Sequence, residues 1–424
     1  MKKFTVVLVG GNGYGRTYLN HLLNPEYEEH FKLIAVVDSA ELDLRDDILK
    51  TGAEIYGSLE DFYKNKTADL AIISTPPFLH ESMSIYCMEK GSSVLCEKPL
   101  TPTLQQARNI QQCIDRTGKK FGVGFQWSYS PSVLELKKDI LDGLFGKPLS
   151  FWTFMSWPRG LRYYDRWTGN LFDSRGNYLL DSVAANATAH YLHNSLFLLG
   201  DRLDTAAKIK NMNAELYRAN DIESYDTCTV KYNTVSGVEL GYTATHATNF
   251  MQDPILEYRF ENGVLNSKFA KVDFSFRFDR NSVYGNLARA PVERVSGFVF
   301  RFNDGREKEY GYPSDVVHKT LGVGRAAVSG EDSYNTCKLY TVLPHLTLCN
   351  AMLDFNDIVD FPAGIIQHNE EAGRMEIPEL CDQLRSAFDA RKLPSEAGLD
   401  WAKASQWHDI ENYDTFSGSR IKKA

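Results

Sequence analysis

The chain has 424 residues, of which 43% are hydrophobic and 24% charged, and its formal net charge is −8. This length predicts two domains, and the composition is that of a globular protein rather than a disordered one. The acidic balance offers no basic surface for nucleic acid or for anionic lipid.

The cysteines indicate a reducing compartment. Seven of them are scattered along the chain without any CxxC spacing, which predicts reduced thiols and a cytoplasmic protein. Met1-Lys2-Lys3 and the apolar run behind them look like a signal peptide, but the run stops at a glycine turn after about six residues, which is short for such a segment. No stretch approaches the roughly 18 apolar residues of a membrane helix, so we expect no membrane partner.

The chain opens with a short β-rich run, residues 4–9, which leads through a glycine-rich turn into a helix-like stretch at residues 16–23. Glycines at such a turn let the backbone approach a pyrophosphate, whose charge is then stabilised at the helix N-terminus. This pattern predicts a dinucleotide site. The turn residues expected to bind the cofactor are Gly10, Gly11, Asn12, Gly13, Tyr14 and Gly15.

A second apolar run, residues 33–37, ends in Asp38, which lies 23 residues after Gly15. An acidic residue at about this distance binds the ribose hydroxyls of a dinucleotide. We therefore expect Asp38 and the neighbouring Ser39 to contact the cofactor, and the Asp38 carboxylate to favour NAD over NADP. The alternative is a glycine turn in another kind of βα unit, with Asp38 as a helix cap.

Apolar strand cores and helical segments then alternate up to about residue 130. The strands are predicted at residues 70–74, 93–96 and 121–125 and the helices at residues 80–90 and 104–116. This alternation predicts an α/β domain, residues 1–130, with a parallel sheet covered by helices.

After a helix at about residues 131–144, strand-like runs follow one another. They lie at residues 149–157, 206–216, 225–232, 238–247, 255–260, 272–278 and 297–302, and Asn303-Asp304-Gly305 is a strong hairpin turn. Helices are predicted near residues 316–328 and 336–353. The second domain, residues 131–360, is therefore expected to be α+β with a large, mostly antiparallel open sheet. In the extension, residues 361–424, Trp401 and Trp407 suggest docking on the body.

Polar side chains follow the fourth, fifth and sixth strands, at the edge where open α/β sheets bind their ligands. Lys98 there can donate hydrogen bonds to a substrate hydroxyl as it becomes a carbonyl; alternatively it is a solvated loop cation, and His80 a helix-start residue. The residues expected at this edge are Ser74, Thr75, Pro76, His80, Glu97, Lys98 and Gln126.

The motifs G-x-x-G-x-G at residues 10–15, T-P-x-x-x-H at 75–80 and E-K-P at 97–99, in this order, resemble the Gfo/Idh/MocA family. The resemblance implies a Rossmann domain with a bound nicotinamide cofactor. It also implies a C-terminal domain whose open sheet often mediates oligomers, sugar- or polyol-like substrates, and Lys98 as the catalytic lysine.

The second catalytic motif of that family reads roughly D-x-x-x-H, with another Asp three residues later. The counterpart here is Asn186, His190 and His193, whose spacing places them on one helical stripe. The chain thus keeps the histidine and replaces both acids, so His190 is expected to be neutral at physiological pH because an asparagine cannot stabilise its cation. Asp181 is interpreted as a helix N-cap. No cysteine or acid shares the stripe, and no metal is expected.

Several aromatic and basic residues are candidates for a sugar site, since aromatic faces stack on sugar rings. For each of them, a loop packed on the sheet is an equally good explanation. The candidates are Trp127, Tyr129, Tyr163, Tyr164 and Trp167 with Arg162 and Arg166, and His193 is added as a substrate contact.

Together these features predict an NAD-dependent oxidoreductase acting on a sugar, inositol or related polyol, in which His190 takes the hydroxyl proton, Lys98 stabilises the oxyanion and Asn186 holds the substrate or the histidine. One alternative uses transient oxidation for elimination or glycoside cleavage. The other is a nucleotide-binding regulator without turnover, which the loss of the acidic partner of His190 keeps open.

Overall fold

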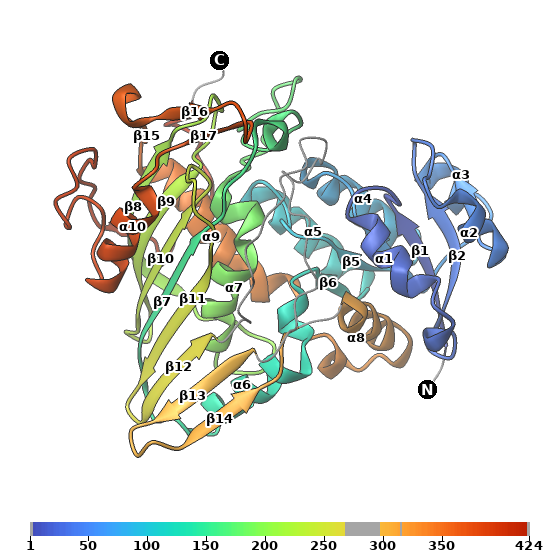
Figure 1. Cartoon of the computed structure of the whole chain (residues 1–424). Coiled ribbons are helices and arrows are strands. Elements are labelled where there is room, and N and C mark those ends of the chain that lie inside the picture. Colours follow the sequence, from blue (N-terminus) through green and yellow to red (C-terminus); the bar gives the residue numbers. More distant parts are fainter. Residues whose placement is uncertain (1–2, 268–296, 314–315, 422–424) are drawn as a thin grey trace. The chain divides into compact units, whose positions relative to one another are not determined.

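The computed structural model describes residues 3–267, 297–313 and 316–421 (Figure 1). The strand predicted at residues 272–278 lies outside these residues. The chain divides into two compact units. The first comprises Met1–Leu134, Leu203–Thr205 and Pro313–Leu343, and the second comprises Glu135–Arg202, Ala206–Tyr312 and Pro344–Ala424.

A six-stranded parallel sheet forms the centre of the first unit. Its order is β3-β2-β1-β4-β5-β6, so the chain winds outward in both directions from the pair β1 and β4. The strands are short and almost wholly apolar because helices cover a parallel sheet on both faces. They are β1 (Phe4–Val9), β2 (Phe31–Val37), β3 (Glu54–Tyr56), β4 (Leu70–Ile73), β5 (Ser93–Cys96) and β6 (Phe121–Val123). The predicted Rossmann architecture is confirmed.

The helices of this unit begin and end at recognisable signals. In α5, Thr103 and Gln106 form a reciprocal capping box, and Gly118 ends the helix with a φ of 66°. The helices are α1 (Gly15–Leu22), α2 (Arg45–Lys50), α3 (Leu59–Tyr63), α4 (His80–Glu89), α5 (Leu104–Thr117) and α8 (Val316–Ser329). Single turns precede or follow them at η1 (Pro25–Tyr27), η2 (Pro77–Leu79), η3 (Gln126–Tyr129) and η6 (Asp332–Tyr334).

Helix α8 differs from the expected domain division. The sequence places it in the second domain, residues 131–360, but it packs on α1, β1, β4 and β5 of the first unit. Gly324 permits this packing, because a Cβ atom there would lie 2.2 Å from the Phe4 ring. The chain therefore returns to the first unit after β14 and goes back to the second unit at Pro344.

The second unit is built on a ten-stranded sheet. Its order is β14-β13-β12-β11-β7-β10-β9-β8-β15, with β18 also paired to β8. All pairings are antiparallel except β7 with β10 and β8 with β15, which confirms the predicted α+β class. The strands are β7 (Pro148–Ser156), β8 (Ile209–Arg218), β9 (Thr227–Thr234), β10 (Glu239–Thr245), β11 (Gln252–Phe260), β12 (Gly263–Ser267), β13 (Phe298–Phe302), β14 (Glu307–Tyr310), β15 (Ile358–Asp360) and β18 (His408–Asp409).

The hairpin predicted at Asn303-Asp304-Gly305 joins β13 to β14. Phe302 and Arg306 close the turn with a backbone hydrogen bond of 2.9 Å, and Gly305 has a φ of 89°. A small separate hairpin pairs β16 (Gln367–Asn369) with β17 (Arg374–Glu376).

Alternate residues of a strand point to opposite faces, and helices pack on both faces of this sheet. Tyr232 and Tyr242 contact Ser195 and Thr188 near α7 on one face, whereas Trp152 and Phe154 pack on α10 on the other. Figure 1 shows α10 outside the sheet. The helices and turns of this unit are α6 (Pro131–Leu141), which begins in the first unit, η4 (Leu161–Tyr164), η5 (Val183–Ala187), α7 (Ala189–Leu198), α9 (Leu339–Phe355), η7 (Ala363–Ile365) and α10 (Leu380–Asp389).

The C-terminal extension packs on this sheet, but only one of its two tryptophans takes part. Trp401 packs with Tyr217 and Phe361, and its Nε1 donates to Gln383 Oε1 at 2.7 Å. Trp407 is 44% exposed. The expectation that both tryptophans dock is wrong for Trp407, because it precedes β18 at the edge of the sheet.

All seven cysteines are buried and none forms a disulfide. Within residues 3–267, 297–313 and 316–421, no helix combines the length and the apolar character needed to cross a bilayer.

Candidate functional site

The glycine turn between β1 and α1 is closely packed on its neighbours. Gly10 has a φ of 85°, and a Cβ atom there would lie 2.4 Å from the Ser74 carbonyl oxygen. A Cβ atom on Gly15 would lie 1.9 Å from the Gly10 carbonyl oxygen. Only glycine fits at either position, so the tight turn that leads into α1 depends on both glycines. Asn12 is not among the residues with positive φ, which are Gly10 and Gly13 in this turn.

Asp38 lies at the end of β2 and binds the same turn. Its Oδ2 accepts hydrogen bonds from the backbone amides of Gly11 at 2.9 Å and Asn12 at 3.4 Å, while Oδ1 accepts from Ala40 at 2.9 Å. Ser39 beside it is exposed. The carboxylate is therefore fixed next to the turn, as a ribose-binding acid requires.

Two loops at the ends of β4 and β5 are joined by His80. The Nε2 atom of this fully buried side chain lies 2.8 Å from the Thr75 carbonyl oxygen, and Nδ1 lies 2.9 Å from that of Pro99. Burial lowers the pKa of His80, and the carbonyl contacts act in the opposite direction. Both ring nitrogens contact backbone carbonyl oxygens, so His80 holds together the loops that carry Thr75, Pro76 and Lys98. Direct contact of His80 with the cofactor stays a prediction.

Glu97 is the centre of a buried polar network below Lys98. Tyr18 donates to its Oε1 at 2.6 Å, Lys319 forms an ion pair with the same atom, and the Lys98 amide donates to Oε2 at 3.0 Å. Lys319 also donates to the Gly124 carbonyl oxygen at 3.3 Å. The peptide bond between Lys98 and Pro99 is cis. The backbone of the predicted catalytic lysine is thus attached to a fixed carboxylate.

The environment of this network disfavours charge. Lys319 is fully buried, and this burial lowers its pKa, which Glu97 partly offsets. Burial likewise raises the pKa of Tyr18, and it lowers the pKa of His21 to about 4, with the Lys319 charge as the second cause. A buried ion pair of this kind is costly to break, because one charge is then left alone.

Three further predicted residues follow β6. Gln126 Oε1 is buried and accepts no hydrogen bond from any described residue, so it remains a cofactor candidate. Trp127 and Tyr129 are each 5% exposed, and the Tyr129 hydroxyl contacts Asn335 Oδ1 at 3.0 Å and the Cys337 carbonyl oxygen at 3.1 Å. These contacts agree with the alternative explanation for Tyr129, a residue packed in the protein interior rather than one that contacts the substrate.

In the second unit, Asn186 is bonded to Asp181. The Asn186 side-chain amide donates to Asp181 Oδ1 at 2.9 Å, and the Gly169 amide donates to Oδ2 at 2.6 Å. The helix N-cap is Ser182, whose hydroxyl accepts from the Ala185 amide at 3.1 Å. The interpretation of Asp181 as the cap is therefore wrong by one residue, and its carboxylate is left to bind Asn186.

The predicted helical stripe is wrong for Asn186, whereas His190 and His193 both lie in α7, three residues apart. Residues Val183–Ala187 form a π-helical turn, and α7 begins only at Ala189, so Asn186 does not lie on the same regular helix as His190. His193 is 1% exposed, with its ring 5.9 Å from that of Phe197 and 6.4 Å from that of His345. Burial lowers the pKa of His193 well below its usual value, with His345 and Lys137 as further causes. These contacts place His193 in the core rather than at a substrate.

The remaining substrate candidates lie in and after η4. Tyr163 and Tyr164 are half-buried with ring centroids 5.1 Å apart, and the Tyr164 hydroxyl is buried without a partner among the described residues. Arg162 and Arg166 are exposed and Trp167 is half-buried. Among the described residues no group of three or more His, Cys, Asp or Glu side chains has the arrangement of a metal site.

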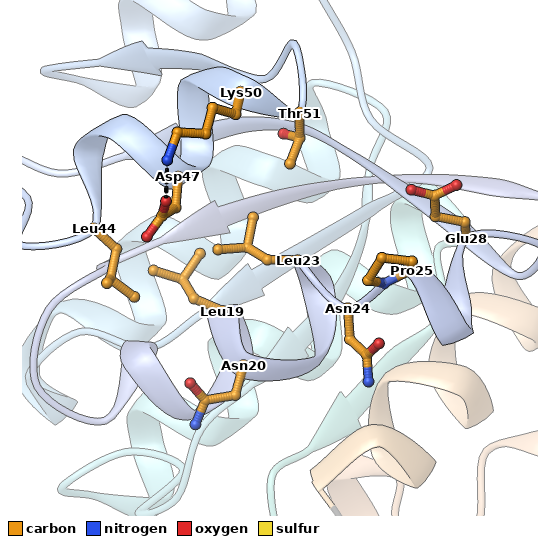
Figure 2. Close-up of a pocket in the computed structure, with 10 residues that line it drawn as sticks. All are labelled: Leu19, Asn20, Leu23, Asn24, Pro25, Glu28, Leu44, Asp47, Lys50 and Thr51. Atoms are coloured by element: carbon orange, nitrogen blue, oxygen red, sulfur yellow. Dashed lines mark hydrogen bonds and ion pairs between the residues drawn. The ribbon is translucent and has the colours of Figure 1, made fainter.

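A groove between α1, η1 and α2 includes none of the predicted residues (Figure 2). It lies at the C-terminal half of α1, beyond Leu19, whereas the glycine turn is at the other end of that helix. Of its three charged side chains, Asp47 and Lys50 pair with each other at 2.8 Å, and Glu28 is the third. The groove is therefore not the dinucleotide site.

The fold and the glycine turn define a dinucleotide-binding domain. Residues 4–125 match the GFO_IDH_MocA family, described as an oxidoreductase family with an NAD-binding Rossmann fold. The N-terminal domain of this chain belongs to that family.

Relatives are distant but cover much of the chain. An inositol 2-dehydrogenase of Rubrobacter xylanophilus is 23% identical over 58% of this chain and 66% of its own length, just under two thirds. The WlbA dehydrogenase of Bordetella pertussis, solved with NADH and UDP-GlcNAcA, is 21% identical with a TM-score of 0.63, over 82% of this chain and 95% of that one. An aldose-aldose oxidoreductase of Caulobacter crescentus, solved with glycerol, is 16% identical with a TM-score of 0.61, over 83% and 96%. The solved structures confirm the fold.

Lys319 is the site residue that the sequence did not reveal. It lies more than 200 residues after Glu97 in an otherwise ordinary helix. The only local signal is a lysine on the apolar side of α8, and a lysine is usually read as solvated.

Proposed function

We propose that the protein is an NAD-dependent oxidoreductase that transfers a hydride between nicotinamide and a sugar, inositol or related polyol. The observation that carries this proposal is the attachment of the Lys98 amide to the buried Glu97 carboxylate at the end of β5. This fixes the lysine at the same sheet edge as the glycine turn and Asp38, where open α/β sheets bind their ligands.

The residues of the first unit fit a dinucleotide. The glycine turn is held in a tight form, because a Cβ atom at Gly10 or Gly15 would collide with a backbone carbonyl oxygen, and Asp38 is fixed beside it. NAD would be held by these residues, and by Ser74, Thr75 and Gln126 at the neighbouring strand ends; when bound it supplies the hydride acceptor. The Asp38 carboxylate would oppose the 2′-phosphate of NADP, since like charges placed together in an interface cost several kcal/mol.

Two side chains are assigned to the reaction, one to the negative charge on the substrate oxygen and one to the proton of the substrate hydroxyl. Lys98 would donate a hydrogen bond from Nζ to the substrate oxygen as negative charge develops on it. A neutral His190 would accept the proton of the substrate hydroxyl. Asn186 would orient this region of the second unit through its bond to Asp181.

The substrate class rests on the relatives. The chain is similar to an inositol 2-dehydrogenase, and similarly folded structures contain UDP-GlcNAcA or glycerol. All of these carry several hydroxyl groups, which supports a sugar or polyol and a role in carbohydrate metabolism. The absence of a disulfide among the seven buried cysteines supports a cytoplasmic location.

A homo-oligomer through the C-terminal sheet is also proposed. The part of the outer face on β7 and β10 is covered by α10 and the extension. The interface would therefore use β11 to β14, where Arg259 pairs with Glu257 and Arg301 with Glu307. These ion pairs lie within one chain and do not themselves hold a partner. Light scattering at low and high salt would test the proposal: an oligomer supports it, and a monomer at all salt concentrations would refute it.

One observation favours a second candidate, a nucleotide-binding regulator. Asn186 replaces an acid in the motif and its side-chain amide is bonded to Asp181, so the residue four positions before His190 carries no charge.

The experiment is NAD reduction, followed at 340 nm with a panel of inositols, aldoses and sugar acids, with NADH binding measured in parallel. Net reduction that His190→Ala abolishes supports the oxidoreductase. NADH binding without turnover of any panel member would favour the regulator, and product without net reduction would indicate transient oxidation.

A further inference from the structure

The carboxyl ends of β7 and β10 meet in the second unit. These two strands are parallel, and their pairing continues past the sheet: the Trp157 amide donates to the Thr245 carbonyl oxygen at 2.9 Å, and the Arg159 amide donates to that of His246 at 3.3 Å. The side chains of Trp157, Arg159 and His246 therefore leave the backbone at one corner of the sheet.

His246 presents a buried acceptor at this corner. The side chain is 2% exposed, and Nδ1 lies 2.8 Å from the Trp157 carbonyl oxygen. A carbonyl oxygen only accepts, so Nδ1 carries the hydrogen, and burial, followed by the Arg159 charge, lowers the pKa of the ring and keeps it neutral. Nε2 then carries a lone pair that can accept a hydrogen bond, and no described residue donates to it. A buried acceptor of this kind calls for a hydroxyl or amine from a ligand.

Arg159 adds a positive charge next to His246. Its guanidinium carbon lies 5.2 Å from the centre of the Tyr163 ring, and that ring lies 5.7 Å from the His246 ring. Apart from its contacts with the Tyr163 and Trp157 side chains, it donates a hydrogen bond to the Pro158 carbonyl oxygen at 3.2 Å, and no carboxylate among the described residues forms an ion pair with it. A half-buried guanidinium in this situation is suited to a planar anion.

The acids nearby are engaged elsewhere. Asp181 accepts from Gly169 and Asn186, and Asp226 accepts from the amides of Ala219 and Asn220 and from the Asn220 side chain. The Trp157 Nε1 donor is buried and has no acceptor in the described part of the chain. The corner thus offers one neutral acceptor beside two donors, one of them charged.

We propose that this corner binds a sugar acid, whose carboxylate accepts hydrogen bonds from Arg159 and Trp157 Nε1 and whose hydroxyl donates to His246 Nε2. The inference narrows the substrate class of the proposed function and rests on it for catalysis, but not for binding. It makes Arg159 and His246 specificity-determining residues, one for charge and one for a hydroxyl donor.

The test measures binding by calorimetry in the full-length protein without cofactor. The probes are D-glucuronate, D-galacturonate and D-gluconate, with D-glucose and the methyl ester of D-glucuronate as neutral counterparts. The variants are Arg159→Met and His246→Phe. The matched control is His408→Phe, since His408 in β18 also has a buried Nε2 without a partner among the described residues.

For the wild type we expect at least one acid to bind about 10–100-fold more tightly than its neutral counterpart, as hydrogen bonds to charged groups do. Arg159→Met should remove this difference, His246→Phe should weaken the acid and the ester by a similar factor of about 5, and His408→Phe should change neither. Equal binding of acids and neutral sugars, or an acid preference that survives in Arg159→Met, would overturn the inference.

The same variants separate this inference from the proposed function. NAD reduction with neutral polyols, combined with equal binding of acids and neutral sugars, would leave the oxidoreductase standing and overturn the sugar-acid site. Acid binding that depends on Arg159, without NAD reduction, would support the site and refute the oxidoreductase.

Discussion

The side-chain amide of Asn186 donates a hydrogen bond to Asp181 Oδ1 across 2.9 Å. An acid that the motif lacks at position 186 is thus present five residues earlier, brought close by the π-helical turn Val183–Ala187. The bond changes what a substitution at Asn186 should do. From the sequence alone, Asn186→Asp should raise the pKa of His190; in the structure the new carboxylate meets Asp181 first.

We predict that Asn186→Asp lowers the free energy of unfolding, and more so at pH 8 than at pH 5. Two carboxylates this close cannot both ionise cheaply, so the pKa of one rises in the folded state and stability is lost as pH increases. Denaturation by urea at both pH values measures the effect. The exchanged pair Asp181→Asn with Asn186→Asp is the control and should recover most of the loss. Equal stability of the single variant and the wild type at pH 8 would show that the two side chains do not interact.

The second prediction concerns Asp38 and the choice of cofactor. The wild type should bind NADH at least tenfold more tightly than NADPH, because the carboxylate is fixed beside the turn by Gly11 and Asn12. Asp38→Asn keeps an oxygen acceptor for these amides and removes the charge, so it should narrow the difference while NADH affinity changes only a few-fold. Calorimetry with both cofactors decides it; NADPH binding as tight as NADH in the wild type would contradict the assignment.

The third prediction concerns the buried pair of Glu97 and Lys319. Lys319→Met leaves the Glu97 carboxylate without its cation and should cost about 3–5 kcal/mol of unfolding free energy. The double variant Glu97→Met with Lys319→Met removes both charges and the oxygen that accepts from the Lys98 amide, and it should recover much of this stability. Its turnover should nevertheless stay reduced if Glu97 positions Lys98. Full turnover in the stable double variant would mean that the network serves folding alone.

The fourth prediction is a loss of stability in acid due to His21. In the folded protein, burial lowers the pKa of His21 from 6.5 to about 4. The Nε2 atom of its ring lies 3.1 Å from the Thr320 hydroxyl. Between these values the unfolded state binds a proton that the folded state does not, so stability decreases as pH falls from about 6.5 to 4, by about 3 kcal/mol. His21→Gln should flatten the slope of unfolding free energy against pH in this window. An unchanged slope would contradict the shift.

The sequence predicts the parts of this protein that depend on local pattern. The alternation of apolar runs, the glycine turn and Asp38 predict the Rossmann unit, and Asn303-Asp304-Gly305 predicts a hairpin that the structure confirms. The sequence does not predict contacts between residues that are far apart in the chain and meet only because a later segment packs on an earlier domain. Lys319 reaches Glu97 because the chain returns to the first unit at α8 after most strands of the second unit have formed, and no spacing in the sequence encodes this return.

The helix around His190 shows a second limit. Spacings of four and three residues imply a stripe only if the helix is regular, and one π-helical turn displaces Asn186 from it. The N-cap shows the same limit. Serine and aspartate are both preferred at this position, so the sequence could not tell that Ser182 rather than Asp181 caps the turn.

The central claim is that Lys98 acts on the substrate of an NAD-dependent oxidoreductase, and turnover of Lys98→Ala tests it most directly. With the substrate that the wild type oxidises best, kcat at 340 nm should fall by about 10²–10³, as for the loss of one donor to a developing oxyanion. NADH affinity and thermal stability should remain close to those of the wild type. Turnover within tenfold of the wild type, in a variant that still binds NADH, would contradict the account.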